Sequence, residues 1–326
     1  MRAIQADRID SLADYAEVET AIPEPRAGQV RIRVAAIGVG YVDALVALGR
    51  YQVKPTPPHV PGSEISGEVE AVGEDVTGLS VGDRVLAMGS RGFADYALAP
   101  AAMTVPLPGS LTFEQGASLP LNYLTALHGL LGRAGTNAGE RVLVLGAAGG
   151  VGIAAVQVAR ALGAHVIAAA SSAEKRAFAL EHGAHESIDT DPQGWRDRLR
   201  ATLNRAPLNI VFDPVCGPLF EPAFRSLGWG GRHLVVGFVG GPIPALPSNL
   251  TLMKGAALIG VDVRQFMLFE APLARDHLRT LANWAAERQI SPPVGRVFEW
   301  DDYGEALTFA LGGKGVGKTV LRGRAH

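Results

Sequence analysis

The sequence contains a single cysteine, Cys216, among its 326 residues. An intrachain disulfide is therefore excluded, and a lone thiol fits a reducing compartment, so we expect a cytoplasmic protein. No apolar run approaches the roughly 18 residues of a membrane span, and residues 1–20 are rich in acidic side chains, unlike a signal peptide. The formal net charge is only −2, so nothing points to a nucleic acid or to an anionic membrane as a partner.

The apolar content, by contrast, is ample for large cores. The hydrophobic fraction is 48%, and a length of 326 residues is typical of about two domains. Residues 1–122 contain short alternating runs separated by proline and glycine, which predicts a β-rich, barrel-like domain. Residues 123–263 alternate strand and helix patterns, which predicts a doubly wound parallel sheet and an α/β fold. Residues 264–326 hold a long amphipathic helix and two more strand patterns.

The most informative stretch runs from Arg141 to Ala170. An apolar run, a glycine-rich turn, a helical pattern and a second apolar run follow one another, as in a βαβ unit. Glycines let the backbone approach a pyrophosphate, and the helix N-terminus offers unpaired N–H groups and a positive dipole end. The turn matches a dinucleotide fingerprint, with alanine in the first glycine place, through Ala147, Gly149, Gly150, Val151 and Gly152. The alternative is an ordinary glycine-rich turn between a strand and a helix.

The residues after the second apolar run indicate which nucleotide fits. NAD sites usually carry an acidic residue there for the ribose 2′-hydroxyl, whereas this chain continues with two serines and, beyond Glu174, two cations. A charged hydrogen bond of about 1.5–3 kcal/mol to a 2′-phosphate would favour NADPH roughly ten- to a hundredfold. We therefore expect NADPH, bound by Ser171, Ser172 and Lys175, although Glu174 would repel the phosphate. Alternatively, Ser171 and Glu174 form only a capping box.

Several short strings resemble the medium-chain dehydrogenase/reductase superfamily. They are Val60–Glu64 with Gly67, Val72-Gly73, Val81–Val85, Thr125-Ala126, Ala147–Gly152, Asp213–Val215 with Gly217, and Gly317-Lys318. Within the superfamily the chain looks like the zinc-free NADPH:quinone oxidoreductase branch. This resemblance implies a GroES-like substrate and catalytic domain at 1–122, a Rossmann dinucleotide-binding domain at 123–263, and a return segment at 264–326 that completes the first domain. It also implies a substrate and nicotinamide site in the cleft between the domains, and homodimers or tetramers.

The residues argue against a catalytic zinc. Zinc alcohol dehydrogenases of this superfamily carry Gly-His-Glu, where this chain has Gly62-Ser63-Glu64. Their thiolate ligands and four-cysteine lobe cannot be built from Cys216 alone. No His-x-x-x-His pair on a predicted helix replaces them, and we interpret His59 as a packed loop histidine.

Without a metal, the chemistry depends on orienting NADPH against an electron-poor acceptor. The cofactor supplies the hydride, and positioning two reactants can lower a barrier by about 7–11 kcal/mol. The developing oxyanion needs a hydrogen-bond donor, for which the candidates are Tyr41, Tyr51 and Tyr123, unless each tyrosine only packs. Relatives place an asparagine where this chain has Gly40, so a polar substrate contact is missing. Asp43 is a further catalytic candidate, with the alternative that it only orients its loop.

The resemblance also implies further contacts to the cofactor. These residues are Asn122, Thr125, Asp213, Pro214, Val215, Phe238, Val239, Asn249 and Lys318. Cys216 is expected to be a small buried residue beside the site, not a reactive thiol. The string Gly312–Thr319 satisfies the P-loop pattern, but a helix pattern precedes it and a strand pattern follows, the reverse of what that motif requires.

Together these observations predict an NADPH-dependent, zinc-independent oxidoreductase. It would transfer a hydride to a quinone or to an α,β-unsaturated carbonyl, with a small electrophile as its partner and no nucleic acid or membrane. Two alternatives stay open. One is a relative that kept the nucleotide-binding fold but lost turnover and acts as a structural or RNA-associated protein. The other is an enoyl-thioester reductase, which would need a basic site for the phosphates of CoA.

Overall fold

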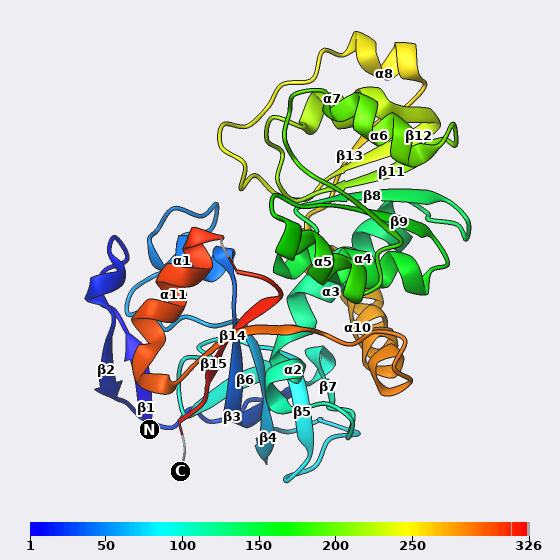
Figure 1. The fold of residues 1–326 in the computed structure, drawn as a ribbon. Helices are drawn as coiled ribbons and strands as arrows, with labels where there is room; N and C mark the ends of the chain where they lie inside the picture. The colour runs from blue at the N-terminus through cyan, green and yellow to red at the C-terminus, as the bar shows by residue number, and fades with distance from the viewer. Residues whose placement is uncertain (314, 325–326) are drawn as a thin grey trace. The chain divides into compact units, whose positions relative to one another are not determined.

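The computed structural model describes residues 1–313 and 315–324 and divides into two compact units. The first unit comprises Met1–Leu121, Arg275–Arg288 and the chain from Pro292 onward. The second comprises Asn122–Ala274 and Gln289–Ser291. Figure 1 shows the helices and strands of both units, coloured along the chain. Among the described residues, no helix has the length and apolarity needed to cross a bilayer.

The second unit contains the parallel sheet that the alternating patterns predict. Its strand order is β10-β9-β8-β11-β12-β13, and every pairing is parallel. The strands are β8 (Arg141–Leu145), β9 (His165–Ala169), β10 (Glu186–Ile188), β11 (Leu208–Asp213), β12 (Leu227–Val235) and β13 (Ala257–Gly260). The chain reverses its direction of travel across the sheet between β8 and β11, as in a doubly wound dinucleotide-binding fold. The predicted fold class is therefore confirmed for this unit.

Helices cover both faces of this sheet (Figure 1). On one face lie α4 (Gly150–Ala161) and α5 (Ala173–Glu181), and on the other lie α6 (Trp195–Leu203) and α7 (Phe220–Ser226). Because both faces are covered, the central strands read as continuous apolar runs, and every residue of Val142–Leu145 is buried. The unit also contains α3 (Pro120–Leu127), a π-helix (His128–Arg133), α8 (Asn249–Lys254) and α9 (Val263–Phe269).

The first unit is built on a mainly antiparallel sheet of order β14-β15-β3-β4-β5-β7, with β6 paired to β3. Its strands are β3 (Gln29–Val39), β4 (Glu64–Val72), β5 (Arg84–Met88), β6 (Tyr96–Pro100), β7 (Thr104–Pro106), β14 (Val294–Phe298) and β15 (Lys318–Arg322). The last strand, β15, pairs with β3, so that Thr319 lies opposite Val39. The C-terminal strands thus complete the sheet that the N-terminal segment begins.

Alternation along β3 accounts for its two faces. Val30 and Ile32 are buried in the core, whereas Arg31 and Arg33 point outward and pair with Glu70 and Glu68 on β4. The unit is completed by β1 (Arg2–Gln5), β2 (Ala16–Glu19), α1 (Tyr41–Ala47), α2 (Phe113–Ser118), α11 (Tyr303–Gly312) and the 3-10 turns Leu12–Asp14, Ala101–Met103 and Trp300–Asp302. It also includes α10 (Ala271–Ala286) from Arg275 onward, the first turn of this helix belonging to the second unit.

Candidate functional site

The glycine-rich turn joins β8 to α4. Gly146 adopts φ +62°, a conformation that side-chain-bearing residues rarely take, so the sharp bend is made one residue before Ala147. This position of the bend explains why alanine is accommodated where the fingerprint has its first glycine. The buried Ala147 donates its N–H to the carbonyl oxygen of Ala169 at 3.1 Å, which ties the turn to the end of β9.

Gly152 has the strictest requirement for glycine in this turn. A Cβ atom there would stand 2.1 Å from the carbonyl oxygen of Gly146, whereas a Cβ atom on Gly149 would find that oxygen at 3.5 Å. Gly149 caps α4 with an extended backbone, and Gly150–Gly152 form the first helical turn, whose N–H groups lack partners within the helix. The turn therefore has the geometry that accepts an anionic group at a helix N-terminus.

The segment after β9 carries the hydroxyls and cations predicted to meet a 2′-phosphate. Ser172 caps α5, since its Oγ accepts the N–H of Lys175 at 3.2 Å, so the cap lies one residue later than in the alternative reading with Ser171. Ser171 is exposed, and Lys175 is half-buried. Arg176 folds back, and its Nη1 donates to the carbonyl oxygen of Ala170 at 3.1 Å.

Asp213 ends β11 with a carboxylate that is completely buried. One oxygen, Oδ1, accepts the N–H groups of Val215 at 2.9 Å and Cys216 at 2.7 Å, and Oδ2 lies 3.1 Å from Nε2 of His233. The side chain thus fixes the turn that follows β11. Cys216 is buried in that turn, as expected, and desolvation raises the pKa of its thiol to about 12, which leaves it unreactive at neutral pH.

The turn after β11 lies between the loop after β12 and the glycine-rich turn, and contacts both through Val215. Gly240 donates its N–H to the carbonyl oxygen of Val215 at 2.8 Å, and a Cγ atom of Val215 lies 2.9 Å from where a Cβ on Gly146 would stand. Phe238 and Val239 are 43% and 53% exposed, so their side chains are accessible to a ligand. These residues gather at the carboxyl ends of β8, β11 and β12, where ligands bind in doubly wound sheets.

Four other predicted residues of this unit lie on helices. Asn122 is half-buried and Thr125 buried on α3, and the exposed Asn249 begins α8. Tyr123, also on α3, is 1% exposed and donates its hydroxyl to Oε1 of Gln157 at 2.8 Å. Burial raises the pKa of Tyr123 well above its usual value, and its hydroxyl is committed to the core. Tyr41 and Tyr51 are less buried than Tyr123, and this exposure fits their predicted contact with a substrate.

The catalytic candidates belong to the first unit, where β3 leads into α1. Gly40 is the N-cap of α1, and Asp43 accepts the N–H of Gly40 through Oδ2 at 2.8 Å. Asp43 is also buried, so its hydrogen bond to Gly40 fixes the backbone at the corner where β3 leads into α1. Tyr41 and Tyr51 are both partly exposed.

A buried ion pair lies beneath this corner. The ammonium group of Lys318, on β15, donates to Oε1 of Glu64, and Oε2 of Glu64 accepts the N–H of Leu121 at 3.0 Å. Burial raises the pKa of both Glu64 and Asp43, while the charge of Lys318 lowers both. Glu64 is absent from the predicted site residues, although the strings Gly62-Ser63-Glu64 and Gly317-Lys318 contain both members of the pair.

Two glycines make room for the Lys318 side chain. A Cβ on Gly38 would stand 2.9 Å from Cε of Lys318, and one on Gly40 would stand 3.3 Å from both its Nζ and Oδ2 of Asp43. Any side chain at position 40 would therefore meet the two charged groups.

The His, Cys, Asp and Glu side chains of the described residues do not form a ligand set that fits a catalytic zinc. Throughout residues 1–313 and 315–324, no group of three or more His, Cys, Asp or Glu side chains is arranged to hold a metal ion. Cys216 is buried and hydrogen-bonded to the carbonyl oxygen of Asp213. Glu64 is already occupied by Lys318 and the Leu121 amide. A tetrahedral zinc site of nitrogen and sulfur ligands has no basis in these residues.

Comparison with known proteins gives matches along most of the chain. The family described as alcohol dehydrogenase GroES-like domain matches residues 26–109, and the family described as zinc-binding dehydrogenase matches residues 150–278. The chain is 34% identical to quinone oxidoreductase-like protein 2 of Bos taurus, over 93% of this chain and 88% of that protein.

Two solved structures are similar over nearly their full length. One is a mycobacterial protein complexed with NADPH, at 30% identity and a TM-score of 0.89, covering 99% of this chain and 100% of the other. The other is the quinone oxidoreductase from Thermus thermophilus, studied also in its complex with NADPH, at 32% identity and a TM-score of 0.85, covering 99% and 100%. These matches confirm the predicted combination of a GroES-like β-rich domain with a Rossmann domain.

Proposed function

Since the chain belongs to the quinone oxidoreductase-like family of the medium-chain dehydrogenase/reductase superfamily, we propose that it is an NADPH-dependent oxidoreductase. Its acceptor is a quinone or an α,β-unsaturated carbonyl. The observation that carries the proposal is the turn from Gly146 to Gly152, whose backbone admits no Cβ at Gly152 and opens onto the first turn of α4. The complexes of its relatives with NADPH support the choice of coenzyme.

The reaction we propose needs no zinc. The matched family carries zinc in its description, but the donor set of this chain does not suit that metal, and Ser63 stands where a ligating histidine would be needed. Quinones and enones are electron-poor enough to accept a hydride when a hydrogen bond, in place of a strong Lewis acid, stabilises the developing oxyanion.

NADPH, when bound, supplies the hydride. The residues of the chain bind and orient it: the turn Ala147–Gly152 holds the pyrophosphate, and the segment Ser171–Lys175 holds the 2′-phosphate. We assign the nicotinamide side to Asn122 and Thr125, and the remaining coenzyme contacts to Asp213, Val215, Phe238, Val239 and Asn249. Lys318 is left out of this assignment, because its ammonium group is buried against Glu64. Tyr41 or Tyr51 donates the hydrogen bond to the substrate oxygen, while Asp43 shapes the corner that carries Tyr41.

The proposal is tested by coenzyme oxidation with a panel of acceptors. NADPH and NADH at matched concentrations are offered a benzoquinone, a naphthoquinone, an alkenal and an enoyl-CoA. With at least one of the two quinones or the alkenal, NADPH is expected to be oxidised at least about ten times faster than NADH, because its 2′-phosphate gains charged hydrogen bonds. Preference for the enoyl-CoA would favour the thioester reductase instead. Tight NADPH binding without turnover on any acceptor would favour a non-catalytic relative.

We also propose a homodimer formed through the edge of the parallel sheet. The strand β13 ends the sheet order, with Leu258 41% exposed, and Trp229 on the neighbouring β12 is 86% exposed. Further exposed apolar side chains follow on α8 and α9: Leu252, Met253, Leu268 and Phe269. An unpaired edge strand flanked by exposed apolar groups is a ready template for a second chain.

The dimer proposal predicts a mass of twice the 34.1 kDa chain in sedimentation equilibrium at micromolar concentration. Leu258→Lys is expected to give a monomer that still binds NADPH, because a buried unpaired charge at the edge opposes pairing. Val81→Lys is the matched control, since Val81 is also exposed but lies in the other unit. A wild-type monomer, or a Leu258→Lys dimer, would contradict this mode of association.

A further inference from the structure

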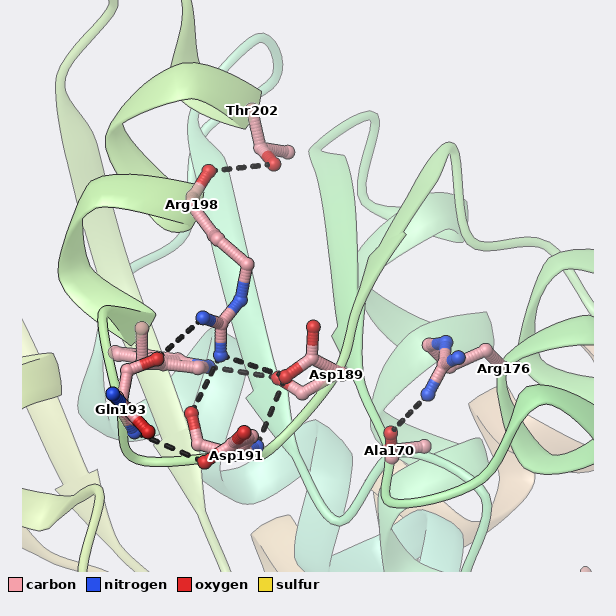
Figure 2. Close-up of polar contacts among 8 residues, drawn as sticks. Ala170, Arg176, Asp189, Asp191, Gln193, Arg198 and Thr202 are labelled. Carbon is pink, nitrogen blue, oxygen red and sulfur yellow. Dashed lines mark hydrogen bonds and ion pairs between the residues drawn. The ribbon is translucent and has the colours of Figure 1, made fainter.

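A guanidinium group clamps the loop that follows β10 (Figure 2). Nη2 of Arg198, on α6, donates to Oδ1 of Asp189 at 2.8 Å and to the carbonyl oxygen of Asp191 at 2.6 Å. Its Nη1 donates to the carbonyl oxygen of Gln193 at 2.5 Å. The N–H of Asp191 also donates to Oδ1 of Asp189, at 2.9 Å. One carboxylate oxygen of Asp189 therefore accepts hydrogen bonds from two donors.

The residue that carries the clamped carboxylate lies beside the end of β9. In the sheet, Ile188 lies opposite Ala169, and Ala170 donates its N–H to the carbonyl oxygen of Ile188 at 3.1 Å. Asp189 therefore follows next to Ala170, whose own carbonyl oxygen holds Arg176. In Figure 2, Asp189 lies between Arg198 on one side and the Ala170–Arg176 contact on the other. The end of this second strand is where a dinucleotide fold places the adenosine ribose.

An acidic group in this place has opposite effects on the two coenzymes. It suits the ribose 2′-hydroxyl of NADH and repels the 2′-phosphate of NADPH. Partial burial opposes ionisation of Asp189, but the Asp191 amide and the Arg198 guanidinium outweigh it and lower the pKa of Asp189. The group is therefore a carboxylate at neutral pH, and its charge is compensated by Arg198 through the ion pair.

Arg176 differs from Arg198 in the use of its N–H groups. One of them donates to a neutral carbonyl oxygen, and no described residue forms an ion pair with Arg176. Its positive charge is therefore available to an anion. A planar guanidinium with several free N–H groups is well suited to a phosphate.

We propose that Arg198 sets the coenzyme preference by compensating the Asp189 carboxylate, and that Arg176 contacts the 2′-phosphate of NADPH. The inference rests on the proposed NADPH-dependent function and adds residues beyond Ser171, Ser172 and Lys175. Arg198 acts through Asp189 and is a positioning residue, whereas Arg176 touches the coenzyme. Without Arg198, the Asp189 carboxylate is uncompensated and repels the phosphate.

The test measures the dissociation constants of NADPH and NADH by fluorescence titration, which requires no acceptor. Arg198→Met is expected to weaken NADPH binding about tenfold and to leave NADH binding unchanged or stronger. Adding Asp189→Asn to Arg198→Met is expected to restore NADPH binding to within about threefold, because the repelling charge is gone. Arg176→Met is expected to weaken NADPH binding about tenfold without affecting NADH.

Arg200→Met is the matched control on the same helix, since Arg200 is exposed and, among the described residues, forms its ion pair with Asp197 at the surface. It is expected to change neither constant. If Arg198 only stiffens the loop, Arg198→Met should weaken the binding of NADPH and of NADH equally, and Asp189→Asn should not restore NADPH binding. That result would overturn the inference. If Arg198→Met proves unstable in a thermal melt, Arg198→Lys, which keeps the charge, must retain the NADPH preference.

Failure of this inference is distinguishable from failure of the proposed function. A protein that binds NADPH with the expected pattern but reduces no acceptor refutes the oxidoreductase proposal and leaves the role of Arg198 standing. A wild-type protein that does not discriminate between NADPH and NADH overturns the role of Arg198, whatever acceptor it reduces.

Discussion

Replacing Gly152 with valine is expected to raise the dissociation constant of NADPH at least about a hundredfold. The new Cβ atom would lie 2.1 Å from the carbonyl oxygen of Gly146, so the backbone of the turn must move. Any such movement takes the first N–H groups of α4 away from the pyrophosphate. Losing two charged hydrogen bonds of about 1.5–3 kcal/mol each is enough for this effect, since 1.4 kcal/mol is about a tenfold change. Isothermal titration with NADPH measures it directly.

Gly304→Val is the control for a glycine near the start of a helix. Gly304 is the second residue of α11, and a Cβ atom there would meet no atom within 4 Å. The control is expected to bind NADPH as the wild type does. Because the clash at Gly152 also strains the fold, both variants are first compared by thermal melting and circular dichroism. A folded Gly152→Val protein that binds NADPH normally would exclude this turn as the coenzyme site.

The sequence predicts the parallel sheet well because its signals are local. Continuous apolar runs in β8 and β9, separated by a glycine turn and a helix, can form only a few structures, and both runs are buried. The same local signals show that the glycine-rich turn follows the carboxyl end of β8, which is the edge of the sheet where a ligand is expected to bind. A one-residue detail, Ser172 in place of Ser171 as the cap of α5, depends on backbone angles that a pattern does not specify.

The buried polar groups could not be predicted in the same way. Lys318 and Glu64 are 254 positions apart, and each reads as a surface residue, since unpaired charges are almost never fully buried. They meet because β15 adds to β3, and β3 pairs with β4, which begins at Glu64. The clamp of Arg198 on Asp189 likewise depends on how α6 returns to the sheet. The first contact follows from long-range strand pairing, and the second from the path of the loop between β10 and α6, so local periodicity predicts neither.

The most destabilising single change outside the coenzyme turn is expected to be Lys318→Met. It leaves the buried Glu64 carboxylate without its cation, and breaking a buried pair costs about 3–5 kcal/mol. For a unit of this size, that corresponds to a fall of roughly 10 °C in melting temperature. The measurement is thermal unfolding followed by circular dichroism. Arg322→Met is the control on the same strand: Arg322 pairs with Glu114 and Glu299 at the surface, so its loss should barely change the melting temperature.

The loss of stability in Lys318→Met should depend on pH in a defined direction. Burial raises the pKa of Glu64 and Asp43, and Lys318 is the charge that opposes this rise. Without it, the folded state favours the protonated acids more strongly. A carboxyl group whose pKa is higher in the folded state than in the unfolded state, where it is near 4, stabilises the folded protein at pH values below the unfolded-state pKa. This stabilisation is lost as the pH rises through the folded-state pKa. The deficit should therefore be small at pH 5 and large at pH 8.

A rescue separates this electrostatic cause from a simple loss of packing. Adding Glu64→Gln to Lys318→Met removes the uncompensated carboxylate while keeping an oxygen that can accept the Leu121 N–H. The double variant should regain part of the lost stability at pH 8 and show a weaker dependence on pH. If the loss of stability in Lys318→Met is equal at both pH values and is unaffected by Glu64→Gln, then Lys318 stabilises the fold mainly by packing its side chain against Gly38 and Gly40.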